Sequence, residues 1–200
     1  MNELATLTVI NTATDADLPA NALNYSLLAA PSFAEVDPSG VITWTPGEDQ
    51  GSTTNVFTMW VTDNSPAAVN AQQLSATNTF TVIVNELNLS PALPVQTNRA
   101  INELTTLTIT NTATDSDIPV NGLSYALLVA PGTATINTNG VITWIPSEAD
   151  GPSLVTFTTV VTDTNEFALI NQQLSATNTF TVTVNEVNVA PVRRRRTTGR

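Results

Sequence analysis

Hydrophobic and polar residues alternate along most of the chain. In "NTFTVTVNE", Phe180, Val182 and Val184 alternate with polar residues, and "TLTITNT" repeats the pattern with Leu107 and Ile109. A period of two, carried by β-branched and aromatic side chains, is typical of strands that bury one face. No stretch sustains a period of 3.6 residues, so the pattern predicts a fold built almost entirely of β-strands.

The chain repeats itself with an offset of 100 residues and without a gap. "NTATDADLPANALNYSLL" aligns with "NTATDSDIPVNGLSYALL", and Trp44 aligns with Trp144. Internal repetition at this length indicates tandem copies of one domain, and domains of about 100 residues are common. We predict a first repeat at 1–88 that lacks its own strand A, a second repeat at 89–188, and a basic tail at 189–200 that is in phase with strand A of a next repeat.

Turn signals rich in Pro, Gly, Asp and Asn divide the second repeat into seven short predicted strands. Seven short strands in about 100 residues, without the Cys–Trp–Cys spacing of antibody domains, indicate an Ig-like Greek-key sandwich. The predicted fold is all-β, with two seven-stranded sandwiches stacked end to end and with Trp44 and Trp144 in their cores. Strands A to G are predicted at 93–101, 105–112, 122–129, 133–137, 141–145, 154–162 and 176–185.

The composition excludes several classes of function. The chain has no cysteine, histidine or lysine, which rules out disulfides, imidazole zinc sites, Schiff bases and the usual catalytic triads. The formal net charge of −11 speaks against nucleic acids and anionic membrane surfaces, and it favours cations. No apolar run approaches the roughly 18–20 residues of a membrane-spanning helix, so no membrane insertion is predicted.

Acidic and amide residues concentrate in the loops at the two ends of each predicted sandwich. The A–B, E–F and post-G segments lie at one end, and the B–C and F–G segments lie at the other. If the repeats stack, the first end of one repeat faces the second end of the next. The residues predicted to meet there are Glu3, Glu48, Asp49, Glu86, Asn88, Asp115, Asp117, Asn121 and Asp163. The corresponding residues at the outer ends are Asp15, Asp17, Asp63, Glu103, Glu148, Asp150 and Glu186.

Two interpretations of these acidic loops remain open. Seven carboxylates that face one another repel strongly, and Ca²⁺, which accepts six to eight oxygen ligands, would relieve the repulsion. Alternatively, the loops are acidic because loops are polar and solvated charge keeps an extracellular protein soluble.

Carboxylate pairs could also serve as the acid and base of a glycosidase. Here they recur in both copies and away from any predicted cleft, so we predict no enzyme activity.

Several segments together resemble the cadherin family and its bacterial cadherin-like and Ig-like relatives, which occur in surface adhesins and extracellular fibres. The resemblance is carried by "ATDADLPANALNYSLL", "VDPSGVITWT" and "FTMWVTD", and by the linkers "FTVIVNELNLSP" and "FTVTVNEVNVAP". It implies an extracellular or cell-surface adhesion or structural repeat, forming a rod or filament, with Ca²⁺ between successive domains. It places the calcium ligands at the acidic and amide positions named above.

The linkers depart from the cadherin pattern D-x-N-D-N-A-P. Glu86 takes the first acidic place and Asn88 keeps the asparagine, but Leu89 and Ser90 stand where the second Asp-Asn pair would be. The second linker has Val189 and Ala190 at those places. The resemblance therefore implies fewer ions at each junction, or weaker binding.

The expected partners are copies of the chain or neighbouring repeats, joined head to tail. Binding to a cell-surface protein or glycan without metal is an alternative, and the tail, which has the repeat phase of strand A, could donate a strand to a next subunit. The whole sequence could instead be a two-repeat window of a longer tandem array, or the tail could be an end added to the chain. Nucleic-acid binding by "RRRR" is not expected. The predicted partner contacts are Phe167, Leu169, Ile170, Arg193, Arg194, Arg195 and Arg196.

Overall fold

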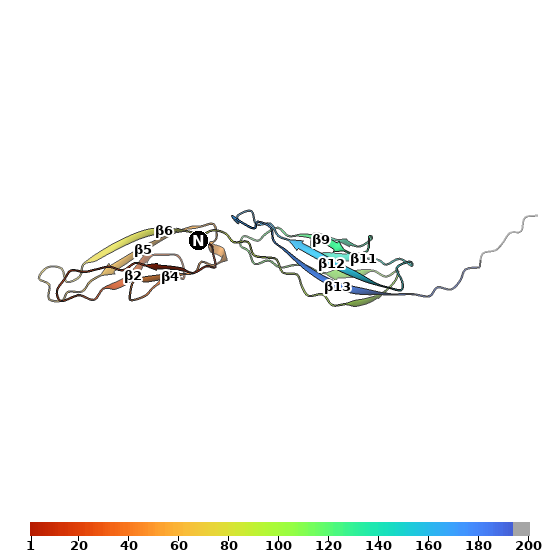
Figure 1. Cartoon of the computed structure of the whole chain (residues 1–200), viewed down its shortest axis with the longest axis horizontal. Helices are drawn as coiled ribbons and strands as arrows, with labels where there is room; N and C mark the ends of the chain where they lie inside the picture. The colour runs from red at the N-terminus through yellow and green to blue at the C-terminus, as the bar shows by residue number, and fades with distance from the viewer. Residues whose placement is uncertain (194–200) are drawn as a thin grey trace, which may run out of the picture. The chain divides into compact units, whose positions relative to one another are not determined.

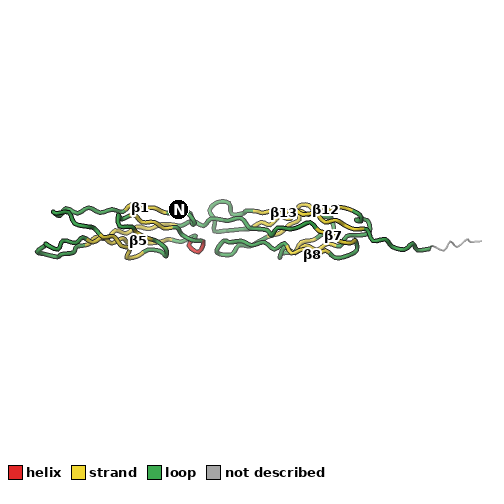
Figure 2. Tube along the Cα trace, turned by 90° about the horizontal axis from the view of Figure 1, so that it is seen from below, coloured by secondary structure: helices red, strands yellow, loops and turns green. Residues whose placement is uncertain are grey.

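A computed structural model describes residues 1–193, which form thirteen β-strands and one short 3₁₀ helix, η1 (Glu48–Gln50) (Figure 1). Figure 2 shows strands separated by loops along the whole described chain, with η1 as a single red turn. None of the helical segments in this range is long and apolar enough to cross a membrane. The predicted all-β fold class is confirmed.

Contacts between Cα atoms divide the chain into two compact units. The first unit contains Met1–Leu89 together with two loops, Ser116–Asn121 and Asn165–Gln172. The second unit contains the remaining described residues. Both loops lie in the predicted second repeat by sequence, yet their contacts assign them to the first unit.

The first unit is a sandwich of two antiparallel three-stranded sheets, ordered β1-β4-β3 and β2-β5-β6. Trp44 meets Phe57 edge to face at 5.4 Å between ring centroids, and Phe57 stacks on Phe80 at 5.0 Å. These rings join the sheets, because Trp44 belongs to one sheet and both phenylalanines belong to the other. The strands are β1 (Leu7–Ile10), β2 (Asn24–Ala29), β3 (Glu35–Val36), β4 (Val41–Trp44), β5 (Thr54–Thr62) and β6 (Ser75–Ile83).

The second unit repeats this arrangement with a fourth strand in one sheet. Its sheets are ordered β10-β11-β8 and β7-β13-β12-β9, and β7 runs parallel to β13. Phe157 and Phe180 stack at 5.3 Å, and Trp144 meets Phe157 at 5.6 Å. The strands are β7 (Arg99–Asn102), β8 (Leu107–Thr110), β9 (Ser124–Val129), β10 (Thr135–Ile136), β11 (Val141–Trp144), β12 (Ser153–Thr162) and β13 (Ser175–Asn185).

The short hairpin between β3 and β4 follows from the sequence "DPSG". The Asp37 carboxylate accepts hydrogen bonds from the backbone N–H groups of Ser39 (2.8 Å) and Val41 (2.9 Å). Gly40 has φ +82°, a left-handed conformation that glycine adopts at little cost. Asn137 accepts the equivalent bonds in the second unit, so both copies build this hairpin in the same way.

Trp44 and Trp144 lie in the cores, as predicted, and each is 1% exposed. The largest difference concerns predicted strand A, 93–101, which is regular only from Arg99 onward in β7. Pro94 interrupts the strand, because proline has no N–H to donate to a ladder. Side chains hold this stretch instead: Asn178 donates to the Pro94 carbonyl at 2.8 Å.

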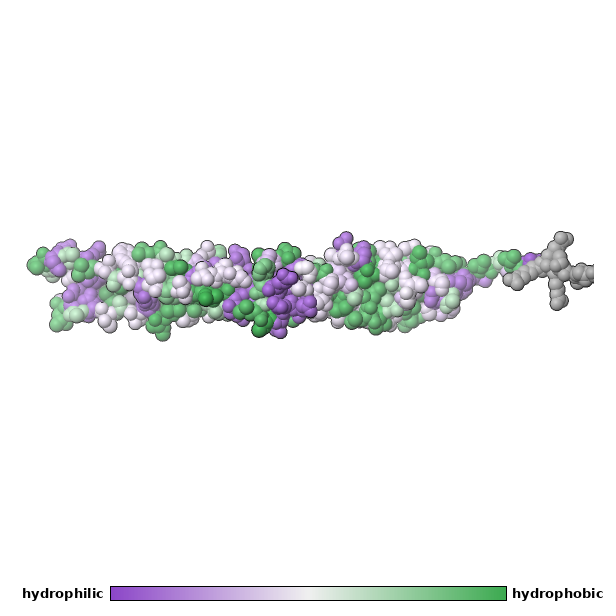
Figure 3. All heavy atoms as spheres, turned by 90° about the horizontal axis from the view of Figure 1, so that it is seen from above, coloured by the Kyte–Doolittle hydropathy of each residue, from purple (hydrophilic) through white to green (hydrophobic). Residues whose placement is uncertain are grey.

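The surface mixes hydrophobic and hydrophilic side chains, as the face drawn in Figure 3 shows. The strands bury alternate residues, and their outward faces carry many threonines, as in β12 and β13. Cross-strand hydroxyl pairs, such as Thr58 with Thr79 at 3.1 Å, occupy these faces. The strand faces therefore carry few acidic residues, and the charged residues are concentrated in the loops.

Candidate metal centre

Four groups of three carboxylates come together among residues 1–193, and in each group one oxygen per residue lies within 4.8 Å of the others. All twelve residues were predicted as ligands from the sequence. The groups are Glu3, Glu48 and Glu86; Asp15, Asp17 and Asp63; Glu103, Glu148 and Glu186; and Asp115, Asp117 and Asp163.

Two other acidic residues predicted as ligands lie outside these groups. Asp49 is exposed on η1. The Asp150 carboxylate accepts hydrogen bonds from both the backbone N–H and the hydroxyl of Ser147, each at 2.7 Å, and these bonds lower its pKa. Asp150 therefore closes a turn, and the structure does not bring either residue to the carboxylate groups.

Glu3 is the most deeply buried acid of the first unit. Its backbone N–H donates to the Asn85 carbonyl at 3.1 Å, which fixes the residue beside the end of β6, and its side chain is 1% exposed. The Oε1 atom accepts the backbone N–H of Leu87 at 2.7 Å. The Oε2 atom is buried and accepts no hydrogen bond from any described residue. A buried carboxylate oxygen without a donor is costly unless a cation or a proton meets it.

Gly51 provides the space in which two carboxylates converge. A Cβ atom at this position would lie closer than 3 Å to the Oε2 atoms of both Glu3 and Glu86. The backbone of Gly51, with φ −59° and ψ 153°, would accept other residues, so the glycine is required by the space and not by its torsion angles. The Oε2 atoms of Glu3 and Glu86 therefore open onto the same small space.

The loop Ser116–Asn121 brings Asp117 to this part of the first unit. Asp117 is 2% exposed, and its Oδ1 atom accepts the backbone N–H of Leu89 at 3.0 Å. The Asn121 side chain donates to Asp117 Oδ2 and to Asn88 Oδ1, the latter at 3.3 Å. The equivalent Asp17 is exposed, so the two aligned aspartates differ in their surroundings.

Asn165 was missed by sequence reasoning. It is fully buried, and its Nδ2 atom donates to Glu86 Oε1 at 3.1 Å and to Asp117 Oδ2 at 3.4 Å. The equivalent residue of the first repeat is Ser65. This departure from an otherwise close repeat, at a position next to acidic loops, is the signal that could have identified it.

The electrostatics of the centre are unfavourable to charge on Glu3. Burial, together with the charges of Glu86, Glu48 and Asp117, raises the pKa of Glu3 from 4.5 to about 7, against the lowering effect of the hydrogen bond from the Leu87 N–H. A bound divalent cation would reverse this preference by favouring the ionised form.

The second unit contains a matching centre. Glu103 is 2% exposed, accepts the Val187 N–H at 2.8 Å on Oε1, and leaves Oε2 buried without a hydrogen-bond donor among the described residues. A Cβ atom at Gly151 would lie closer than 3 Å to Glu103 Oε2, and the Oε2 atom of Glu186 lies 3.0 Å away from the same point. Burial, followed by the charge of Glu103, raises the pKa of Glu186. The same arrangement of two carboxylates around a glycine thus occurs in both units.

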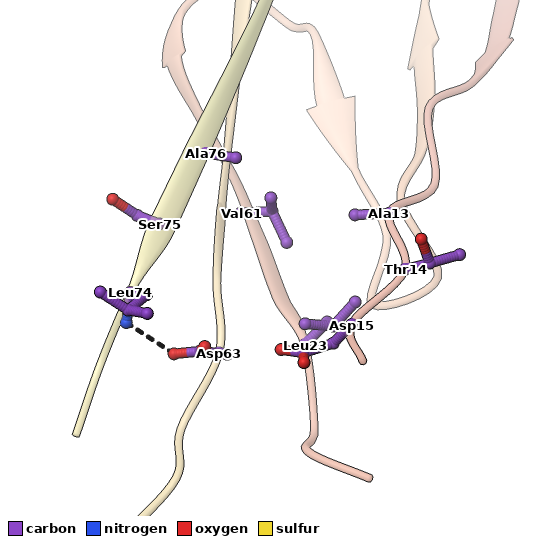
Figure 4. A pocket seen from close by; sticks show the side chains of 9 residues that line it. All are labelled: Ala13, Thr14, Asp15, Leu23, Val61, Asp63, Leu74, Ser75 and Ala76. Atoms are coloured by element: carbon purple, nitrogen blue, oxygen red, sulfur yellow. Dashed lines mark hydrogen bonds between the residues drawn. The ribbon is translucent and has the colours of Figure 1, made fainter. Parts of the chain in front are cut away.

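The aspartates at the other end of the first unit are engaged in loop contacts (Figure 4). Asp63 accepts the backbone N–H of Leu74 at 2.6 Å, and the carboxylate of Asp15 lies across a cavity of about 200 Å³ from it. Asp15 also accepts the Asp17 N–H at 2.8 Å, and Asp17 accepts the side chain of Asn21 at 2.9 Å. Each of these three aspartates of the first copy therefore accepts at least one hydrogen bond within its own loops.

The predicted partner contacts Phe167, Leu169 and Ile170 are exposed by 57%, 72% and 62%, while Ala168 between them is 1% exposed. These three side chains are therefore not buried against their own domain. Arg193 is exposed, and Arg194, Arg195 and Arg196 lie outside the described residues.

The raised pKa of Glu3 predicts a pH dependence of stability. Between its ordinary value of 4.5 and about 7, the folded chain holds a proton on Glu3 that the unfolded chain releases. In a metal chelator, this contribution is complete below about pH 4.5 and is lost as the pH rises to about 7. Urea unfolding over this range measures it. Glu3→Gln should remove this part of the slope, whereas the exposed-site control Glu35→Gln should keep it, and an unchanged slope in Glu3→Gln would contradict the assignment.

Comparisons with known proteins agree with this architecture. Residues 88–185 match the family model of the bacterial Ig domain. A search of the curated proteins found no match. Domains of the bacterial Ig and cadherin-like kinds are generally extracellular, and these families are typically non-enzymatic.

Solved structures similar to the chain include cadherin ectodomains. The extracellular domain of protocadherin GammaB4 matches 92% of this chain and 32% of its own, with 20% identity and a TM-score of 0.46. Human protocadherin-24 EC1-2 matches 86% of each chain, with 18% identity and a TM-score of 0.48. An endo-fucoidan hydrolase from glycoside hydrolase family 107 matches 94% of this chain and 27% of its own, with 15% identity and a TM-score of 0.38. The chain thus spans about a third or less of the GammaB4 and hydrolase chains, and the resemblance of the chain to bacterial Ig-like and cadherin-like repeats is confirmed.

Proposed function

We propose that the chain is a non-enzymatic, extracellular structural or adhesion repeat that binds Ca²⁺ through the carboxylates gathered around Gly51. The observation that carries this proposal is the Oε2 atom of Glu3, which is buried, lacks a hydrogen-bond donor among the described residues and faces the same space as Glu86 Oε2. A carboxylate oxygen in this position is either protonated or bound to a cation.

The donor set suits calcium. Glu3, Glu48 and Glu86 each offer a carboxylate oxygen within 4.8 Å of the other two. Asp117, whose charge acts on Glu3, would add a carboxylate, and Asn88 would add an amide oxygen that already accepts a hydrogen bond from Asn121. Calcium accepts six to eight oxygen ligands with flexible geometry, whereas zinc sites use nitrogen and sulfur donors that this chain lacks. When bound, Ca²⁺ would neutralise the mutual repulsion of these carboxylates.

The candidate ligands come from segments that are far apart in the sequence. Glu3 precedes β1, Glu86 follows β6, and Asp117 lies in the loop Ser116–Asn121. One ion held by all three would connect the end of the first repeat to a loop of the second repeat. This supports a role in stiffening the connection between successive repeats of a rod or filament.

A metal-free module that binds a protein or glycan is the second candidate. The exposed side chains of Phe167, Leu169 and Ile170 favour it, since they form a small apolar surface on one loop. This function does not require the buried carboxylates, so calcium binding separates the two candidates.

Calcium titration followed by nuclear magnetic resonance tests the proposal at the site itself. Saturable shifts are expected at the amides of Leu87 and Leu89, which donate to Glu3 and Asp117. Asp117→Asn should weaken this binding roughly tenfold or more, because it removes one ligand charge. The aligned variant Asp17→Asn is the matched control, and it should leave these shifts unchanged.

Two outcomes would contradict calcium binding at this site. The first is the absence of chemical-shift changes at the Leu87 and Leu89 amides at millimolar calcium, in a spectrum whose amide dispersion shows that the chain is folded. The second is an equal effect of Asp117→Asn and Asp17→Asn, which would indicate diffuse screening of acidic loops instead of a defined site.

A further inference from the structure

Equivalent residues of the two units differ in burial along one sheet. In the second unit, Phe180 and Val182 of β13 are 2% and 0% exposed. In the first unit, the aligned Phe80 and Val82 of β6 are only half-buried. Because the side chains are the same, something that covers them in the second unit is not present among the described residues beside the first.

In the second unit, Ile101 of β7 packs against the core that contains Phe180 and Val182. Before β7, this unit also has the extended segment 90–98. Its Ala92 pairs with Thr114 through two backbone hydrogen bonds of 2.7 and 2.9 Å. Further along, the Pro94 carbonyl accepts the side chain of Asn178 at 2.8 Å. The segment then continues into β7, which pairs with β13.

A network of side-chain amides also differs between the two units. In the second unit, the side-chain amides of Asn111 and Asn178 donate to each other at 3.1 and 2.7 Å. Gln96 of the segment 90–98 also donates to Asn111, at 3.2 Å. In the first unit, Asn78 donates to Asn11 at 3.1 Å, but the Nδ2 atom of Asn11 is buried and bonds to none of the described residues. The network of the first unit is therefore incomplete.

The first unit has an open groove at this place. It is a cavity of about 210 Å³, and its lining includes Asn11, Tyr25, Met59, Ala76 and Asn78. Tyr125 and Asn178, which align with Tyr25 and Asn78, belong to the unit in which the segment 90–98 is present. The groove of the first unit thus lies at positions that align with those which contact the segment 90–98 in the second unit.

We propose that this groove accepts residues 190–198 of a second copy of the chain, so that molecules join by strand donation. Pro191 has the repeat phase of Pro91, and Val192 that of Ala92. Val189 and Val192 are 63% and 89% exposed, so apolar side chains at this end of the chain are available for burial.

Charge supports the same occupant. Residues 1–89 contain nine carboxylates and no lysine or arginine, whereas five of the six arginines lie in the last eight residues. Opposite charges of this size accelerate association at low salt, and high salt screens the attraction. In the sequence, Arg196 has the repeat phase of Gln96, whose side chain donates to Asn111.

Val192→Pro and Asn78→Asp test the two sides of this contact in the full chain. Val192→Pro removes the backbone N–H that would pair with Thr14, the residue aligned with Thr114. Asn78→Asp removes the amide that would donate to a tail carbonyl. Sedimentation velocity between about 10 and 500 µM should show self-association that each variant weakens roughly tenfold. Val69→Pro, at an exposed loop residue, is the matched control and should associate like the parent chain.

Two peptides distinguish the possible occupants, and all measurements are made in chelator, so that they do not depend on calcium binding. A peptide of residues 189–200 should compete with self-association. Absence of association at all concentrations, or association insensitive to both variants, would overturn the proposal. Binding of a peptide of residues 88–98 without binding of the 189–200 peptide would also overturn it, since the groove would then accept a preceding repeat and not this tail.

Discussion

Gly51→Ala is expected to weaken calcium binding at the Glu3–Glu86 centre by about tenfold to a hundredfold, with little loss of folding stability. The added Cβ would overlap the Oε2 atoms of both carboxylates and force them apart. Its backbone angles suit alanine, and the displaced atoms are the ends of flexible side chains, so the folded state can adapt. Calorimetric titration with calcium and urea unfolding in chelator measure the two effects separately.

Gly47→Ala is the matched control for this prediction. Gly47 lies in the same turn, and a Cβ there would lie 3.1 Å from the exposed Asp49 carboxylate instead of between buried ones. It should change neither the calcium affinity nor the unfolding midpoint appreciably. Equal calcium affinity in Gly51→Ala and the parent chain would show that the Oε2 atoms of Glu3 and Glu86 do not hold the ion.

Phe180→Ala is expected to cost about 3–5 kcal/mol of the free energy of unfolding of the second unit, the range for a buried phenylalanine. Phe180 is 2% exposed and stacks on Phe157. The aligned Phe80→Ala should cost about 1–2 kcal/mol less, because Phe80 is half-buried and loses less apolar contact. Guanidinium unfolding followed by circular dichroism provides both values.

This pair also examines the contrast on which strand donation depends. If both phenylalanines cost the same in chelator at low protein concentration, the first unit would be as well covered as the second. In that case the open groove beside β6 would not exist in solution. A smaller cost for Phe80→Ala at low concentration, rising with protein concentration, would agree with a donated strand covering Phe80.

The strands of the second unit were predictable from the sequence, because their physical cause is local. Val182 and Val184 alternate with threonines, and this pattern alone selects β13. The hairpin residues Asp37 and Gly40 are equally local signals. Strand A was predicted too long. The segment is interrupted by Pro94, and its pairing depends on strands that lie far away in the sequence.

The candidate centre was predictable only in part. Repetition and loop position identified Glu3, Glu86 and Asp117, but they gave no reason to separate these residues from Asp49. Burial makes that separation, and burial depends on long-range contacts that no local pattern records. Asn165 was missed for the same reason, since an amide becomes informative only when a carboxylate such as Glu86 lies beside it.

Anomalous X-ray scattering from crystals grown in calcium tests the central claim most directly. We expect a peak between Glu3 Oε2 and Glu86 Oε2, with oxygen ligands at about 2.3–2.6 Å that include Asp117. We also expect the peak to disappear in Gly51→Ala crystals. A map without a peak there, with the Asn165 amide still donating to Glu86 and Asp117, would show that hydrogen bonds and a proton on Glu3 satisfy the carboxylates and that the centre binds no metal.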